Sequence, residues 1–234
     1  MFTQNYIVDE NKCKDAFLKN NNRLKNKWYK LNSTSNVGCM TYLYRKYNYP
    51  ATYQDFFNAY VQDHKKNSKI NGRSIEYLTK VASNLSILDG NKCDISIYFD
   101  YVVQKLIIDT FNGLQKEFEA KELIENHNLQ VEEPTYSEDT DLAIDMKVKK
   151  NNMVKCAIQV KPHTFFLGNS NRSLVNDRRL AIKKENKVKD NLKIPVYYLI
   201  YNKNSGQWIK TESGKLLHHL NNLVNEDGTT KNVI

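Results

Sequence analysis

The sequence lacks the features that mark several specialised protein classes. No stretch of the 234 residues approaches 18 consecutive apolar residues, so a membrane-spanning helix is not expected. The four cysteines form no CxxC pair and the five histidines no HExxH or HxxxH pair, which argues against a zinc site. The first residues carry neither a basic segment nor an apolar segment of the secretory kind. We therefore expect a cytoplasmic protein with no membrane attachment.

What is present describes a folded globular protein. Apolar residues make up 40% of the chain and charged residues 26%, and the 15 tyrosines and 9 phenylalanines are too many for a chain that never packs. A chain of this length is long enough for one large domain, or for one domain with a helical addition.

The net charge of +9 is distributed unevenly along the chain. Residues 1–142 carry a net charge of −1, whereas residues 143–234 carry +10. An A/T-rich genome would raise the lysine content, but it would do so in both halves. The asymmetry therefore favours a protein that neutralises the phosphates of a nucleic acid.

The first 130 residues show helical spacing of apolar positions. Thr52, Ser74 and Asp94 each stand where a side chain can cap the start of a helix. The last of these helices is long and is expected to end near residues 126–128. Glu117 falls on the flank of its apolar stripe, from which it can point along the edge of a sheet.

Beyond residue 134 the apolar period changes from helical to alternating. Residues 144–149 and 154–161 each alternate between apolar and polar side chains, and Asn151 and Asn152 between them favour a turn. The sequence therefore predicts a β-hairpin.

The register of this hairpin follows from which positions are apolar. Directly opposed residues share a face, and the apolar positions on both strands are even-numbered, which predicts a three-residue loop centred on Asn152 rather than a two-residue loop. Asp145 then lies across from Gln159, with Lys161 on the same face. We expect these three side chains to form a cluster.

The rest of the chain completes a mixed α/β pattern. A basic helix over 174–190 is followed by a buried strand over 194–201, a short strand at Trp208 and a final helix over 216–224. The expected fold is a mixed central sheet flanked by helices, with a helical N-terminal region. We divide it into residues 1–104, for DNA recognition or dimerisation, and a core of residues 105–234, and expect both to form one compact unit.

The predicted cluster of Asp145, Gln159 and Lys161 resembles the core of the PD-(D/E)xK nuclease superfamily, and this resemblance implies a site that hydrolyses phosphodiesters. Mg²⁺ binds hard oxygen ligands, which Asp145, the Gln159 amide and the Val160 carbonyl offer, while Lys161 would orient the attacking water or stabilise the charged phosphate. Gln159 supplies no negative charge, so a second carboxylate is valuable, and Glu117 is our candidate.

Asp141 competes with Asp145 for the role of first metal ligand. In the predicted register Asp141 lies about 13 Å further along the strand. That separation is too large for one metal shared with Gln159, unless a bulge intervenes, and we favour Asp145.

This arrangement of an Asp opposite Gln159-Val160-Lys161 resembles the core of the PD-(D/E)xK nuclease superfamily. The usual acidic residue is replaced here by Gln159, as it is in some restriction enzymes of that superfamily. A more specific resemblance, over about residues 37–200, is to the MjaI-type type II restriction endonucleases. It is carried by short pieces: Asn36-Val37-Gly38, Tyr49-Pro50-Ala51-Thr52-Tyr53, Gly72-Arg73-Ser74, Thr110-Phe111-Asn112-Gly113 and Ile158-Gln159-Val160-Lys161-Pro162.

The resemblance implies Mg²⁺-dependent cleavage of double-stranded DNA at a short palindrome. It also implies a homodimer, with one active site for each strand, and a companion DNA methyltransferase encoded nearby. Two alternatives stay open on the residues alone. One is a repair or recombination nuclease of the same fold acting on branched DNA, and the other is a DNA-binding protein without catalysis.

Several basic side chains are candidates for DNA contact, although solvated helix charges or plain loops would have the same sequence. Most belong to the basic segment that follows the hairpin. The candidates are Arg172, Arg178, Arg179, Lys183, His163 and Arg73.

Overall fold

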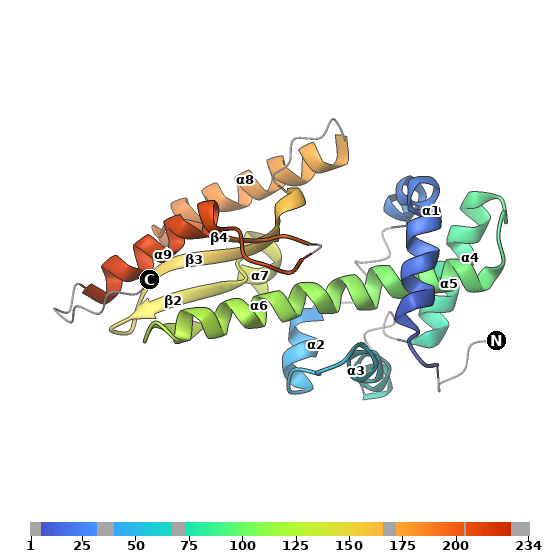
Figure 1. Cartoon of the computed structure of the whole chain (residues 1–234), viewed down its shortest axis with the longest axis horizontal. Coiled ribbons are helices and arrows are strands. Elements are labelled where there is room, and N and C mark those ends of the chain that lie inside the picture. The colour runs from blue at the N-terminus through green and yellow to red at the C-terminus, as the bar shows by residue number, and fades with distance from the viewer. Residues whose placement is uncertain (1–5, 32–39, 67–73, 166–171, 204, 226–234) are drawn as a thin grey trace. The chain divides into compact units, whose positions relative to one another are not determined.

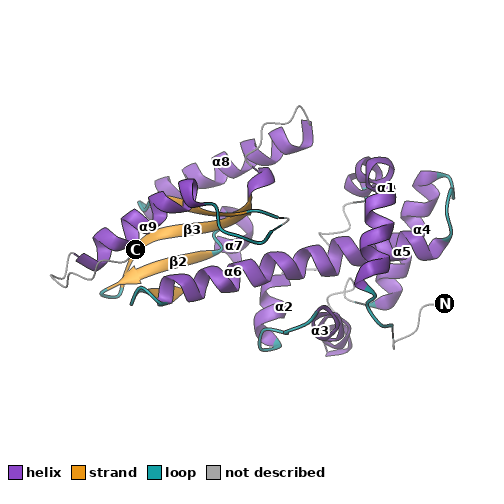
Figure 2. Ribbon diagram, viewed as in Figure 1, coloured by secondary structure: helices purple, strands orange, loops and turns teal. Residues whose placement is uncertain are grey.

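The structure is a computed structural model that describes residues 6–31, 40–66, 74–165, 172–203 and 205–225. The contacts divide the chain into two compact units, Met1–Gln115 and Lys116–Ile234. Figure 2 shows that the strands among the described residues lie in the second unit, whereas the described part of the first is built from helices. The predicted α/β fold with a helical N-terminal region is confirmed.

Helices of the N-terminal unit begin where short polar side chains can accept backbone N–H groups. Ser74 accepts a hydrogen bond from the backbone of Tyr77, and Asp94 accepts one from that of Ser96. Both predicted caps are therefore confirmed, and Thr52 likewise accepts the N–H of Asp55. The helices are α1 (Glu10–Lys30), α2 (Met40–Lys46), α3 (Tyr53–Lys66), α4 (Ile75–Asp89) and α5 (Ile95–Val103). A further helix, α6 (Asp109–Glu125), begins in this unit and ends in the second.

The long helix expected after Asp94 contains one irregular turn. A π-helical segment, η2 (Gln104–Ile108), joins α5 to α6, and the N–H of Asp109 bonds the carbonyl of Gln104. The wider turn shifts the helical phase, and Gln104 is buried there with its amide bonded to the Asp109 carboxylate. Apolar spacing alone does not reveal such a segment, and the sequence predicted an uninterrupted helix.

An aromatic core holds the N-terminal unit together. Tyr60, Tyr98, Phe99 and Tyr101 are each fully buried. The hydroxyl of Tyr98 is satisfied by Asp89, whose side chain is completely buried and also pairs with basic side chains of α1. A buried carboxylate is tolerated here because cations and a hydroxyl surround it.

The C-terminal unit is a four-stranded mixed sheet in the order β1-β2-β3-β4. The pairs β1–β2 and β2–β3 are antiparallel, and β3–β4 is parallel. The strands and helices are β1 (Gln130–Glu132), α7 (Tyr136–Leu142), β2 (Met146–Lys150), β3 (Met153–Pro162), the 3₁₀ turn η3 (His163–Phe165), α8 (Arg172–Leu192), β4 (Val196–Tyr201) and α9 (Lys210–Asn225). Strand β1 and helix α7 were not predicted from the sequence.

The hairpin register differs from the prediction near the turn and agrees with it at the site. The loop has two residues, Asn151 and Asn152, both in the left-handed region with φ of 53° and 61°. A register shift then follows, because Lys149 pairs with Val154 while Val148 pairs with Cys156, which leaves one extra residue on β3. The predicted three-residue loop was wrong, but this bulge restores the predicted register.

Each face of the sheet is covered by its own set of helices. Met146, Val148 and Ile158 pack with the end of α6 and with α9, whereas Ala157 and Val196 pack with Val188 of α8. Figure 1 shows these helices around the sheet. The face under α8 is the one that carries the predicted site residues.

Candidate active site at the start of β2

Asp145 lies one residue before β2, where the chain bends. The alternation expected for a straight strand fails at this point, because Ile144 packs with Ala157 under α8 instead of with Met146 on the other face. The bend turns the carboxylate toward β3, where its Oδ2 atom accepts the backbone N–H of Val160 at 2.6 Å. Asp145 is thereby fixed against the strand that carries Gln159 and Lys161.

Lys161 completes an ion pair with the same carboxylate oxygen. Its Nζ atom lies 3.1 Å from Oδ2 of Asp145, and the side chains are 21% and 10% exposed. The pair is therefore shielded but still accessible to a substrate. The predicted association of Asp145 with Lys161 is present in the structure.

Gln159 lies two residues before Lys161 on β3, on the same face of the sheet. The residue is fully buried, and neither its Oε1 nor its Nε2 has a hydrogen-bond partner among the described residues. Leaving a buried amide unsatisfied costs about 1–3 kcal/mol per group. Such a side chain is suited to a ligand that the free chain does not contain.

The neighbouring strand and helix add two polar groups that the sequence did not reveal. Tyr198 of β4 lies beside Gln159 in the parallel register, and its hydroxyl donates to Oε2 of Glu185 on α8 at 2.9 Å. Burial, this hydrogen bond and the negative charges of Glu185 and Asp145 raise the pKa of Tyr198. Parallel pairing places Tyr198 here, and the sequence alone does not state which strands pair.

The other predicted metal ligands take different positions. Asp141 lies exposed on α7 and not on a strand, so its predicted position further along the strand from Asp145 was wrong. Val160 turns its side chain into the core beneath the sheet and has only its backbone near Asp145. Glu117 lies on α6, one turn before Ala120, which packs against the opposite face of the sheet.

The predicted DNA-contacting residues lie mainly on α8 and after β3. Arg179 and Lys183 are exposed on α8, and His163 is partly buried in η3. Arg172 and Arg178 belong to α8, but their side chains lie outside the described residues, as does the whole of Arg73.

A metal ion at this site would be bound by oxygen atoms of different chemical groups. Within the part of the chain that the structure describes, no three His, Cys, Asp or Glu residues gather as a metal-binding group. Carboxylate, amide and backbone oxygens together fit the hard-oxygen preference of Mg²⁺, which commonly keeps several waters. Asp145 and the unbonded amide of Gln159 therefore form a donor set that suits this ion.

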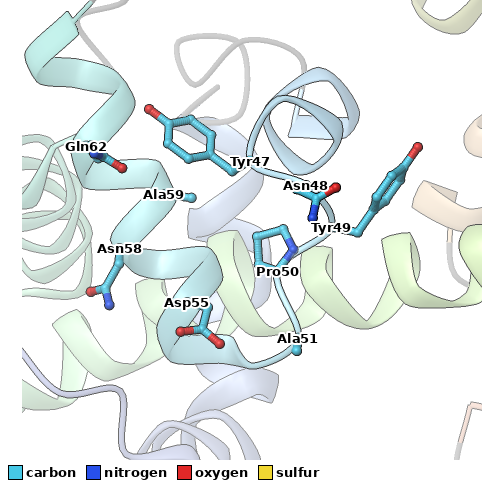
Figure 3. Close-up of a pocket in the computed structure, with 9 residues that line it drawn as sticks. All are labelled: Tyr47, Asn48, Tyr49, Pro50, Ala51, Asp55, Asn58, Ala59 and Gln62. Atoms are coloured by element: carbon cyan, nitrogen blue, oxygen red, sulfur yellow. The ribbon is translucent and has the colours of Figure 1, made fainter.

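The N-terminal unit has a separate pocket of about 370 Å³. The pocket is lined by Asp55, Asn58 and Gln62 of α3 and by the loop that follows α2, as Figure 3 shows. The loop residues Asn48 and Tyr49 both have φ of 55°, a left-handed conformation that turns the chain sharply. The pocket thus presents amide and carboxylate groups from two elements.

Comparison with known protein families identifies the chain. The model of the MjaI restriction endonuclease family matches residues 22–212, most of the sequence. The protein belongs to the MjaI restriction endonuclease family. No match was found among curated proteins or among solved structures. The family resemblance inferred from the sequence is confirmed.

Membership of the MjaI restriction endonuclease family implies a nuclease that acts on DNA. The matched region includes the hairpin, the candidate site and α8. Among the described residues no helix is both long and apolar enough to cross a membrane.

Proposed function

We propose that this protein is a type II restriction endonuclease that hydrolyses double-stranded DNA at a short palindromic sequence in a Mg²⁺-dependent reaction. The observation that carries the proposal is the pairing of Asp145 with Lys161 beside the unbonded, buried Gln159, in a chain of a restriction endonuclease family. The reaction breaks a P–O bond of the DNA backbone and consumes one water.

Each of the proposed ligand residues would bind the cation through a different kind of oxygen atom. Asp145 would hold it with a carboxylate oxygen, Gln159 with its amide oxygen and Val160 with its backbone carbonyl, and Glu117 stays a candidate for a further carboxylate. Bound there, Mg²⁺ would lower the pKa of a coordinated water and neutralise charge on the phosphate. The residues fit this role because all their donor atoms are oxygens.

Lys161 acts on the substrate and not on the metal. In the free protein its ammonium group is held by Asp145 at 3.1 Å, which keeps it aimed at the site. When a phosphate occupies the site, the same ammonium can donate to its oxygens and stabilise the additional negative charge of the transition state. A pre-positioned cation needs no reorganisation at the moment of reaction.

The excess positive charge gives the substrate a docking surface. Arg179 and Lys183 extend from α8, and Arg172, Arg178 and His163 lie on or next to the same element. Contacts of this kind with phosphates are independent of sequence, whereas specificity requires groups that reach base edges. We assign that recognition role to the helical N-terminal unit, including Arg73 and the amide-lined pocket with Asn58 and Gln62, because amides pair bidentately with adenine.

A palindromic site is matched by a two-fold symmetric homodimer that presents one catalytic centre to each strand. A companion methyltransferase would protect the host DNA, and its gene next to this one would support the proposal. The enzyme would act in the cytoplasm, where it meets incoming DNA.

Digestion of a sequenced plasmid with purified protein and Mg²⁺ tests the proposal. Discrete fragments whose ends map to one recurring palindrome are the expected result. Cleavage confined to branched or flapped substrates would replace the proposal with a repair nuclease. Retention on DNA with no strand breaks in Mg²⁺ or Mn²⁺ would replace it with a DNA-binding protein.

A further inference from the structure

Helix α8 is the connection between two parallel strands, and this fixes its direction. Because β3 and β4 are parallel, the chain must return along the sheet between them, so α8 runs antiparallel to both. Val188 of α8 packs over Ala157 and Val196, which form the first residue pair between β3 and β4. The turn of α8 that precedes Val188 therefore lies over residues further along both strands.

That earlier turn carries Glu185, and the strand residues beneath it are Gln159 and Tyr198, which are paired with each other. The hydrogen bond from Tyr198 to Glu185 shows directly that the carboxylate faces the sheet at this level. The side chain of Glu185 is 19% exposed, whereas that of its helix neighbour Lys189 is 50% exposed. Glu185 thus points inward at the level of the unbonded Gln159.

The site has too little negative charge for a divalent cation if it depends on Asp145 alone. Lys161 already offsets the charge of Asp145, and Gln159 is neutral. A carboxylate over Gln159 would restore the charge that the glutamine does not provide. Glu185 is placed for this, and it is currently held by Tyr198 through Oε2 and by Lys189 through Oε1 at 2.6 Å.

We propose that Glu185 is the second carboxylate of the cation site formed by Asp145 and Gln159, with Tyr198 as the residue that positions it. This inference rests on the function proposed above. It also gives Lys189 a role, because the ammonium competes with the bound cation for the Glu185 carboxylate. Removal of the Glu185 carboxylate should therefore weaken cation binding, whereas removal of the Lys189 ammonium should strengthen it.

Calorimetric titration of the full-length protein with Mn²⁺ alone, without DNA, tests the assignment. Glu185→Gln is expected to weaken Mn²⁺ binding at least about 10-fold, and Tyr198→Phe to weaken it less. Lys189→Ala is expected to strengthen binding beyond Lys187→Ala, an exposed lysine of the same helix that controls for the general loss of positive charge. Thermal unfolding of each variant checks that it is folded.

The outcomes separate the inference from the proposal beneath it. If Asp145→Asn weakens Mn²⁺ binding while Glu185→Gln does not, Glu185 only anchors α8 to the sheet and the inference is overturned. Equal effects of Lys189→Ala and Lys187→Ala overturn it as well, and this arm remains informative if Glu185→Gln fails to fold. If Asp145→Asn also binds Mn²⁺ as the wild type does, the proposed metal site itself is wrong.

Discussion

The ammonium of Lys161 lies 3.1 Å from the Asp145 carboxylate, although the two residues are 16 positions apart in the sequence. The hairpin brings them together, since β2 and β3 pair so that Met146 is opposite Ile158. The bend before β2 then turns Asp145 toward the strand that carries Lys161. This contact is the geometric basis of the proposed catalytic centre.

Removal of the ammonium tests the role of Lys161. Lys161→Ala is expected to lower the cleavage rate at least about 100-fold while DNA binding persists, because the group acts on the reacting phosphate and makes only one of many phosphate contacts. Cleavage is followed on a plasmid, and binding by mobility shift without Mg²⁺. Lys203→Ala, which removes the same charge from an exposed position, should cut normally. Full activity of Lys161→Ala would refute the site assignment.

A matched pair of substitutions distinguishes the two aspartates. Asp145→Asn is expected to lower cleavage at least about 100-fold, because the amide still accepts the Val160 N–H but offers a weaker ligand to Mg²⁺. Asp141→Asn, at an exposed position of α7, is expected to cut like the wild type. The reverse pattern would transfer the metal site to Asp141.

The buried carboxylate of Asp89 should dominate the stability of the N-terminal unit. Its side chain is inaccessible to solvent, pairs with Arg23 and with Lys27, and accepts the hydroxyl of Tyr98 at 2.7 Å. Asp89→Asn leaves Arg23 and Lys27, whose side chains are each 27% exposed, without their counter-charge and is expected to cost about 1–3 kcal/mol.

Urea unfolding of the Asp89→Asn variant gives the measurement. Asp15→Asn is its control, because that residue pairs with Lys19 at an exposed position and the substitution should cost less than about 1 kcal/mol. Similar losses in both variants would mean that the Asp89 cluster does not stabilise the fold.

The ion pairs at the edge of the sheet predict a pH dependence of stability. Hydrogen bonds from Lys147 and Lys149 lower the pKa of Glu132 from its usual 4.5 to about 2. A carboxyl whose pKa is lower in the folded state stabilises the fold above its unfolded pKa, and this contribution disappears as the pH falls from about 4.5 to about 2.

Glu132→Gln removes this dependence. Since the carboxylate is 34% exposed, the loss at neutral pH is expected to be about 1 kcal/mol or less, and it should vanish near pH 2. Melting temperatures measured across this range provide the test, with the exposed Glu122→Gln as the reference. A difference from the wild type that stays constant down to pH 2 would contradict the assignment.

The local parts of the fold could be predicted from the sequence because their causes are local. Ser74 and Asp94 cap helices through hydrogen bonds to residues two or three positions away. The alternation of apolar residues predicted the hairpin. The fact that these residues have even numbers on both strands predicted the register at Asp145. The same even-numbered pattern predicted a three-residue loop, which was wrong. A two-residue loop followed by a bulge beyond Asn152 also keeps the apolar residues of both strands on one face.

The sequence by itself determined the capped helices of the N-terminal unit, the hairpin, the concentration of positive charge after residue 142 and the family. Only the tertiary structure decided that Asp141 lies on a helix and that the buried side chain of Gln159 has no hydrogen-bond partner among the described residues. It also decided that Tyr198 pairs with Gln159 and donates a hydrogen bond to Glu185. Those relationships depend on the parallel pairing of β3 with β4 and on the direction of α8 between them. Pairing of distant strands is set by the packing of the whole unit, which no short pattern of residues encodes.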